Sequence, residues 1–185
     1  MSPARLDVER YYQPPTDARK AAVMALLDEK KSGWEITFIK RQAHPKDMHS
    51  GQISFPGGGL EKIDKSYEEC ALRETYEEIG VPPANIDIIG SLTSLYVFAS
   101  NNLVYPFVGY LKEPVEFVQD DTEVEKIISV PLNHFFMPET IKTRELTVRG
   151  HRLNNVPYYD INGQVLWGAT AMMMAEFLSL WKEVR

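Results

Sequence analysis

The segment "RETYEE" contains three glutamates, Glu74, Glu77 and Glu78, within five consecutive residues. Like charges three or four residues apart on a helix repel each other, which costs ~0.3 kcal/mol per pair unless a cation lies beside them. Carboxylate oxygens are also the ligands that Mg²⁺ and Mn²⁺ prefer. The cluster therefore indicates either a solvated acidic helix face or a site for a hard divalent cation.

A helix over residues 67–79 is predicted to carry this cluster. Ser66 begins an S-x-x-E capping box, and a glycine followed by two nearby prolines ends the helix after residue 79. At about 100° per residue, the three glutamates share one side, which we expect to face solvent. The opposite side, expected to be buried, contains Leu72, Thr75, Tyr76 and Ile79.

A glycine-rich segment, "FPGGG" at residues 55–59, precedes this helix. Glycines let the backbone approach a ligand closely and leave a carbonyl oxygen available for coordination. The G-x-G-x-x-G fingerprint of dinucleotide-binding folds and the G-K-[ST] of a P-loop are both absent. A strand, a glycine loop and an acidic helix in succession favour the cation site over the solvated face.

The rest of the chain predicts an α+β protein, an α/β/α sandwich in which a mixed β-sheet is flanked by helices. A C-terminal amphipathic helix is expected after residue 168, with Met173, Phe177, Leu180 and Trp181 on its apolar side. Strands are expected at residues 21–30, 35–42, 52–55, 85–96, 102–111, 125–132, 144–150, 156–161 and 164–168.

Length and composition indicate one globular domain over residues 1–185, with an N-terminal arm at 1–18. The net charge of −6 argues against a protein that holds a nucleic acid backbone. Cys70 is the only cysteine, so no intrachain disulfide can form. Neither a secretory signal nor a membrane-spanning apolar stretch is recognised, and the expected location is cytoplasmic.

The segment Gly58–Val81 resembles the Nudix box, G-x5-E-x7-R-E-U-x-E-E-x-G-U, where U is aliphatic. "RETYEEIGV" matches its second half, with Thr75 at a U position. In the first half Asp64 stands at the acidic position, and one extra residue separates it from Arg73. The resemblance implies a Nudix fold and the hydrolysis of a nucleoside diphosphate linked to another group.

Segments outside the box resemble the coenzyme A diphosphatase branch of that family. "HSGQISFPGG" precedes the box, and "EVEKIISVPL" and "VLWGATAMM" follow it. Asp47 stands where that branch carries an arginine. The matching segments make coenzyme A or an acyl-CoA the leading substrate, with ADP-ribose or another nucleoside diphosphate derivative as the alternative. A nucleotide-binding sensor that does not cleave its ligand is the alternative of another class.

The resemblance also implies roles for individual residues. Mg²⁺ or Mn²⁺ would be held by Glu74, Glu77, Glu78 and the carbonyl near Gly58. Arg73 would orient the glutamates, unless it only forms a surface salt bridge. Glu74 is the preferred general base, and a loop carboxylate such as Glu123 is the alternative. A homodimer is implied by the family alone. The candidates for substrate contact are Arg41, Gln52, Ser54 and Phe55.

Overall fold

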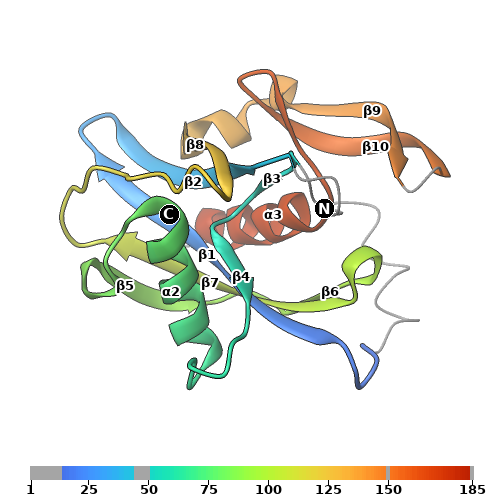
Figure 1. Cartoon of the computed structure of the whole chain (residues 1–185). Helices are drawn as coiled ribbons and strands as arrows, with labels where there is room; N and C mark the ends of the chain where they lie inside the picture. The colour runs from blue at the N-terminus through green and yellow to red at the C-terminus, as the bar shows by residue number, and fades with distance from the viewer. Residues whose placement is uncertain (1–13, 44–50, 149–150, 184–185) are drawn as a thin grey trace.

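The computed structural model describes residues 14–43, 51–148 and 151–183, and there a mixed β-sheet lies between two helices (Figure 1). This architecture confirms the predicted α+β class. In chain order the helices and strands are β1 (Arg19–Lys30), β2 (Gly33–Arg41), β3 (Ile53–Ser54), β4 (Gly57–Gly59), α2 (Tyr67–Ile79), β5 (Ile86–Ser91), β6 (Leu95–Val97), β7 (Asn102–Leu111), β8 (Val124–Pro131), β9 (Ile141–Val148), β10 (His151–Ile161), β11 (Gln164–Leu166) and α3 (Gly168–Glu183).

Strand β1 is the centre of the main sheet. It runs parallel to β7 along one edge and antiparallel to two different strands along the other. Residues 26–30 of β1 pair with β2, whereas residues 21–23 pair with the glycine strand β4. The sheet therefore changes partners midway along β1. The backbone of β4 is bonded to β1 at this point, beside α2.

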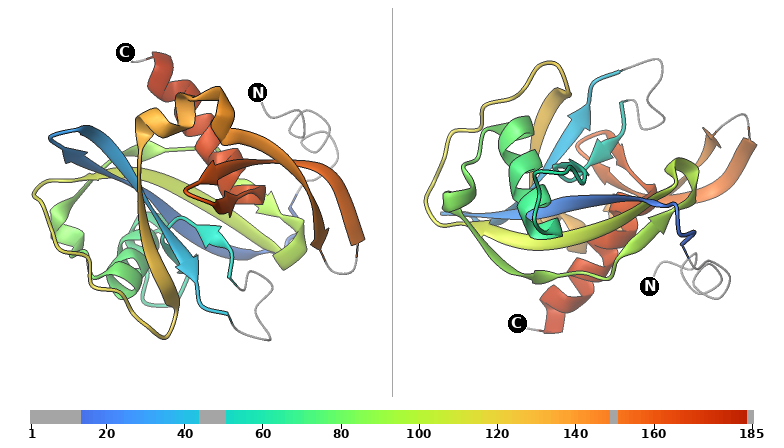
Figure 2. Two further views of the ribbon diagram at one scale, coloured as in Figure 1. Left: turned by 90° about the horizontal axis from the view of Figure 1, so that it is seen from above. Right: turned by 60° about the horizontal axis from the view of Figure 1, so that its bottom comes forward.

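Helices α2 and α3 lie on opposite faces of the sheet (Figure 2). A hydrophobic core lies beneath each helix. Alternate residues of β1 enter them: Met24 and Leu26 pack on the α2 side, and Ala25 and Leu27 on the α3 side. Because both faces are covered, the central part of β1 needs apolar side chains on both sides. This explains the unbroken apolar run "AAVMALL".

The single strand predicted at 85–96 is wrong, because the structure divides it into β5 and β6. Both strands pair with β7, on either side of Pro106. Proline has no N–H to donate, so the ladder is interrupted at that residue. The chain crosses the gap with one bond, from the Leu92 N–H to the Pro106 carbonyl at 2.9 Å.

The buried faces of both helices are rotated from their predicted positions. In α2, Tyr76 is 53% exposed, whereas Cys70, Ala71 and Glu78 are buried. In α3, Leu180 is 47% exposed because it lies at the edge of the arc formed by the buried residues Met173, Met174 and Phe177. No helix in the described ranges is long and apolar enough to cross a bilayer.

The absence of a side chain at Gly109 in β7 is expected to be essential for packing. A Cβ there would lie 2.9 Å from Ile86 Cγ2 and 3.1 Å from Met24 Sδ. Gly109→Ala should therefore lower the free energy of unfolding by about 1–3 kcal/mol, measured by urea denaturation. Among the described residues, no atom would lie within 4 Å of a Cβ on Gly90 in β5, so Gly90→Ala should change stability by less than about 0.5 kcal/mol. Equal effects would contradict this account of the packing.

Candidate active site

Helix α2 begins and ends where the sequence predicted. Ser66 is the N-cap, and its Oγ accepts a hydrogen bond from the Glu69 N–H at 3.1 Å. The Glu69 carboxylate accepts from the Lys65 N–H at 2.9 Å, so the reciprocal bond of the capping box forms one residue earlier than expected. Gly80 ends the helix in the left-handed region, with φ of 73°.

The glycines of β4 let the backbone pass between β1 and α2. Gly57 has φ of 149°, and a Cβ on it would lie 2.3 Å from the Ala22 carbonyl oxygen. A Cβ on Gly58 would lie 2.4 Å from Oε2 of Glu74. The Glu74 carboxylate therefore lies directly against the Cα of Gly58, in the space that a side chain would fill.

Glu78 is buried, with 1% of its side chain exposed. Its Oε2 accepts a hydrogen bond from the Gly57 N–H at 2.8 Å, and its Oε1 lies 3.5 Å from Nη1 of Arg41. Burial raises the pKa of Glu78 to about 8, and the negative charges of Glu74 and Glu123 act in the same direction. The prediction that all three glutamates face solvent is therefore wrong for Glu78.

Glu74 is partly buried, with 12% of its side chain exposed. Burial raises its pKa, while the neighbouring Arg73 acts in the opposite direction. Its Oε1 lies 2.9 Å from Nη1 of Arg73. Glu74 and Glu78 thus occupy one polar region beside β4, where desolvation makes their negative charges unfavourable.

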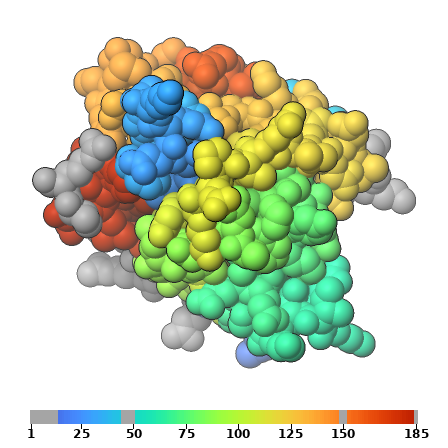
Figure 3. Space-filling model, turned by 90° about the vertical axis from the view of Figure 1, so that its left-hand side faces the viewer, coloured from blue at the N-terminus to red at the C-terminus, as the bar shows by residue number. Residues whose placement is uncertain are grey.

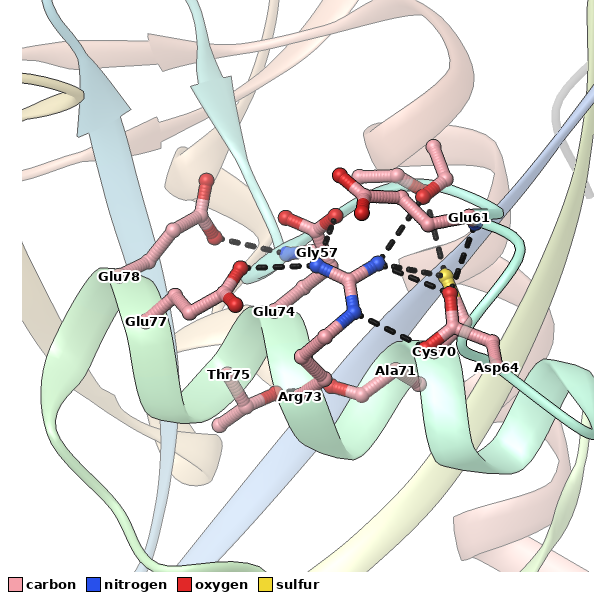
Figure 4. A network of polar contacts seen from close by, with 12 residues as sticks. Gly57, Glu61, Asp64, Cys70, Ala71, Arg73, Glu74, Thr75, Glu77 and Glu78 are labelled. Atoms are coloured by element: carbon pink, nitrogen blue, oxygen red, sulfur yellow. Dashed lines mark hydrogen bonds and ion pairs between the residues drawn. The ribbon is translucent and has the colours of Figure 1, made fainter.

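Arg73 is at the centre of a network that includes three carboxylates (Figure 4). Its Nε and Nη2 donate to the two oxygens of Asp64, both at 2.9 Å. Its Nη1 donates to Oε2 of Glu77 at 2.8 Å, and Nη2 also donates to the Gly59 carbonyl at 3.1 Å. The guanidinium lowers the pKa of Asp64. Arg73 therefore joins the loop before α2, the glycine strand and the helix.

The segment between β7 and β8 lies across the C-terminal end of α2 (Figure 3). The Val118 N–H donates to the Ile79 carbonyl at 3.0 Å, and the Asp120 N–H donates to the Glu78 carbonyl at 3.1 Å. The Glu123 carbonyl accepts from the Gln42 N–H at 2.8 Å. This anchoring places Glu123 close enough for its charge to raise the pKa values of both Glu74 and Glu78.

The residues predicted to contact substrate have different outcomes. Arg41 lies in the site beside Glu78, and its N–H donates to the Gln52 carbonyl at 3.0 Å. The Ser54 hydroxyl is buried and has no hydrogen-bond partner among the described residues. The Phe55 side chain is fully buried and stacks on Phe38 with ring centroids 5.0 Å apart, and its contact with substrate stays a prediction. Asp47 lies outside the described residues.

Within the described ranges, no three His, Cys, Asp or Glu side chains converge as a ready-made metal cluster. The network gives the reason, because Arg73 draws Glu77 toward itself while Gly57 and Arg41 hold Glu78. Sequence reasoning did not foresee the Gly57–Glu78 bond or the pairing of Asp64 with Arg73. The acidic position of the box was the available signal for Asp64.

Residues 17–148 match the family model described as the NUDIX domain. This chain belongs to the Nudix family. It is 34% identical over 141 residues to the uncharacterized Nudix hydrolase NudL of Pectobacterium atrosepticum, covering 74% of this chain and 70% of that protein. It is 31% identical over 173 residues to the mitochondrial Nudix hydrolase 15 of Arabidopsis thaliana, covering 89% of this chain and 59% of that protein.

A third relative is the peroxisomal coenzyme A diphosphatase NUDT7 of Mus musculus, 33% identical over 54% of this chain and 42% of that protein. The chain thus spans less than two thirds of the length of the Arabidopsis and mouse relatives. Solved structures show the same fold, including RenU of M. smegmatis, with a TM-score of 0.56 at 13% identity over 90% of this chain and 85% of that one. The NUDIX domain of Shewanella oneidensis NrtR complexed with ADP ribose has a TM-score of 0.52 at 18% identity, over 75% and 89%.

The pairing of Asp64 with Arg73 is expected to stabilise this Nudix site at neutral pH. Only 3% of the Asp64 side chain and 14% of the Arg73 side chain are exposed. Asp64→Asn should therefore lower the free energy of unfolding at pH 7 by about 1–3 kcal/mol. Glu116 is an exposed carboxylate, and Glu116→Gln should change it by less than about 0.5 kcal/mol.

The effect of Asp64→Asn should depend on pH in a defined direction. The folded protein has a lowered Asp64 pKa, so the carboxylate stabilises the fold at neutral pH and loses this effect as the pH falls below about 3.9. Urea denaturation at pH 7 and pH 3 should show the two proteins converging in acid. A difference that is constant or grows in acid would be inconsistent with the pairing.

Proposed function

We propose that this Nudix chain is a Mg²⁺- or Mn²⁺-dependent hydrolase of the diphosphate bond in a nucleoside diphosphate derivative. The observation that carries the proposal is the position of Glu74 and Glu78 beside the glycine strand β4, where Glu78 bonds to Gly57 and Glu74 lies against Gly58. The charge of Glu123 is near enough to raise the pKa values of both. Negative charges on neighbouring carboxylates in a partly buried region are unfavourable without a nearby positive charge. A bound divalent cation would offset that penalty by neutralising the negative charges.

The residues present fit such a cation. The donors are carboxylate oxygens, and the carbonyl of Gly58, whose Cα lies against Glu74, is proposed as a further one. Oxygen donors suit Mg²⁺ and Mn²⁺ rather than softer metals. Glu74 and Glu78 are the strongest candidates, because both lie beside the glycine strand β4. Glu77 is a weaker candidate, since its carboxylate bonds Arg73 and 53% of its side chain is exposed. When bound, the cation would neutralise diphosphate charge and lower the pKa of a water molecule.

The chain's own residues supply position and proton transfer. Arg73 holds Glu74 and Glu77 in place while Asp64 holds Arg73. Glu74 is our preferred general base, because α2 and Gly58 define its place, and its raised pKa brings it nearer to that of a neutral-pH base. Glu123 is the alternative base, since its loop is anchored to α2 and β2.

Coenzyme A or an acyl-CoA is the proposed substrate, with adenosine 3′,5′-bisphosphate and 4′-phosphopantetheine as products. The support is the resemblance to the branch's sequence motifs and the similarity to the mouse coenzyme A diphosphatase. ADP-ribose is the competing substrate to include in any panel. A cytoplasmic location and a homodimer remain predictions made from the sequence and the family.

Replacement of Glu78 should separate an enzyme from a sensor that only binds nucleotides. Glu78→Gln keeps an oxygen for the Gly57 N–H but removes the charge, so kcat should fall by about 10³-fold or more while ligand affinity changes less. Glu68, exposed on the same helix, supplies the control: Glu68→Gln should retain kcat within about twofold. Products from a panel of diphosphates with Mg²⁺ and Mn²⁺ would be read by mass spectrometry. Wild-type protein without turnover on the whole panel would favour the sensor.

The two neighbouring glycines Gly58 and Gly59 offer a test of the position of Glu74. A Cβ on Gly58 would overlap the Glu74 carboxylate, whereas a Cβ on Gly59 would have no atom of the described part of the chain within 4 Å. Since the displaced group is the end of a flexible side chain, Gly58→Ala should keep its fold but lose about 10²-fold in kcat/KM. Gly59→Ala should stay near wild type. Circular dichroism would check the fold, and equal kcat/KM for both variants would refute the assigned place of Glu74.

A further inference from the structure

The Arg41–Glu78 ion pair is unusual because it joins two residues that the proposed function uses for different purposes. Glu78 is a candidate cation ligand, and Arg41 is a candidate contact for the substrate. They lie on α2 and at the end of β2, and their side chains approach with Nη1 3.5 Å from Oε1. The arginine is 27% exposed and the glutamate 1% exposed, so the pair spans the boundary between the interior and the solvent.

The two oxygens of Glu78 are in different positions. Oε2 is held by the Gly57 N–H at 2.8 Å, within a strand whose backbone is fixed by β1. Oε1 faces the guanidinium of Arg41 at the longer distance of 3.5 Å. A cation that binds Glu78 through Oε1 leaves the buried backbone bond to Oε2 intact, and there it would meet Arg41.

Two positive groups cannot share that oxygen at low cost, because like charges in a partly buried region repel strongly. We propose that the Arg41 guanidinium holds the place of a divalent cation beside Oε1 of Glu78 until the cation displaces it, and that the released guanidinium then binds the diphosphate. A guanidinium suits this second role because its planar array of N–H groups matches phosphate oxygens. The inference rests on the proposed function and deepens it, since binding of the cation would prepare the site for substrate.

The first test is the affinity for MnCl2 alone, measured by isothermal titration calorimetry in oxygen-free buffer at pH 8.5. Arg41→Gln removes the competitor and should bind Mn²⁺ about three- to tenfold more tightly than wild type, whereas Arg41→Lys should stay close to wild type. Lys40 pairs with Glu125 instead, so Lys40→Gln removes the same charge one residue away. This control should change the affinity by less than about twofold, the size expected of a surface charge.

The second test is the affinity for α,β-methylene-ADP, a diphosphate that resists hydrolysis, with Mn²⁺ at saturation. Arg41→Gln should bind it at least about tenfold more weakly, because the charge-assisted contact to phosphate is lost, and Lys40→Gln should not. Thermal melting would establish that each variant is folded, and Arg41→Lys provides the folded comparison if Arg41→Gln is unstable: it should retain measurable affinity for both ligands.

The outcomes separate the inference from the proposed function. Equal or weaker Mn²⁺ affinity in folded Arg41→Gln would overturn the exchange, even if wild type binds Mn²⁺ and hydrolyses a diphosphate. An unchanged affinity for the methylene analogue would overturn the second role of Arg41. Wild-type protein that binds no Mn²⁺ at millimolar concentration would overturn the proposed function itself, and the exchange with it.

Discussion

The hydrogen bond from the Gly57 N–H to the buried Glu78 carboxylate is the contact on which the site depends. It joins the helix to the glycine strand in a region where an unpartnered carboxylate would be very unfavourable. Only glycine suits this position, for two reasons. The backbone of Gly57 has φ of 149°, a conformation that residues with a side chain rarely adopt, and a Cβ there would overlap β1. The glycine strand is therefore a structural requirement for the acidic helix.

The partner change along β1 explains why the glycine strand is where it is. Residues 26–30 of β1 bond to β2, which leaves residues 21–23 available to β4. The same geometry brings the end of β2, with Arg41, beside Glu78. Residues far apart in sequence thus meet because one central strand has different neighbours along its length.

Arg73 pairs with three other carboxylates, those of Asp64, Glu74 and Glu77. The bidentate bonds to Asp64 fix its plane. Asp64, which stands at the acidic position of the box, makes this contact from the loop before α2.

Local signals in the sequence determined a large part of the molecule. The bounds of α2 follow from Ser66 and Gly80, and the class of the fold follows from the order of apolar segments, because caps and periodicity act within a few residues. The sequence also determined the family through its spaced box residues. Only tertiary structure decided which glutamate is buried, since the covered arc of a helix depends on what packs against it. It likewise decided the break opposite Pro106, the burial of Phe55 and the meeting of Arg41 with Glu78, because each depends on contacts between segments that no local pattern records.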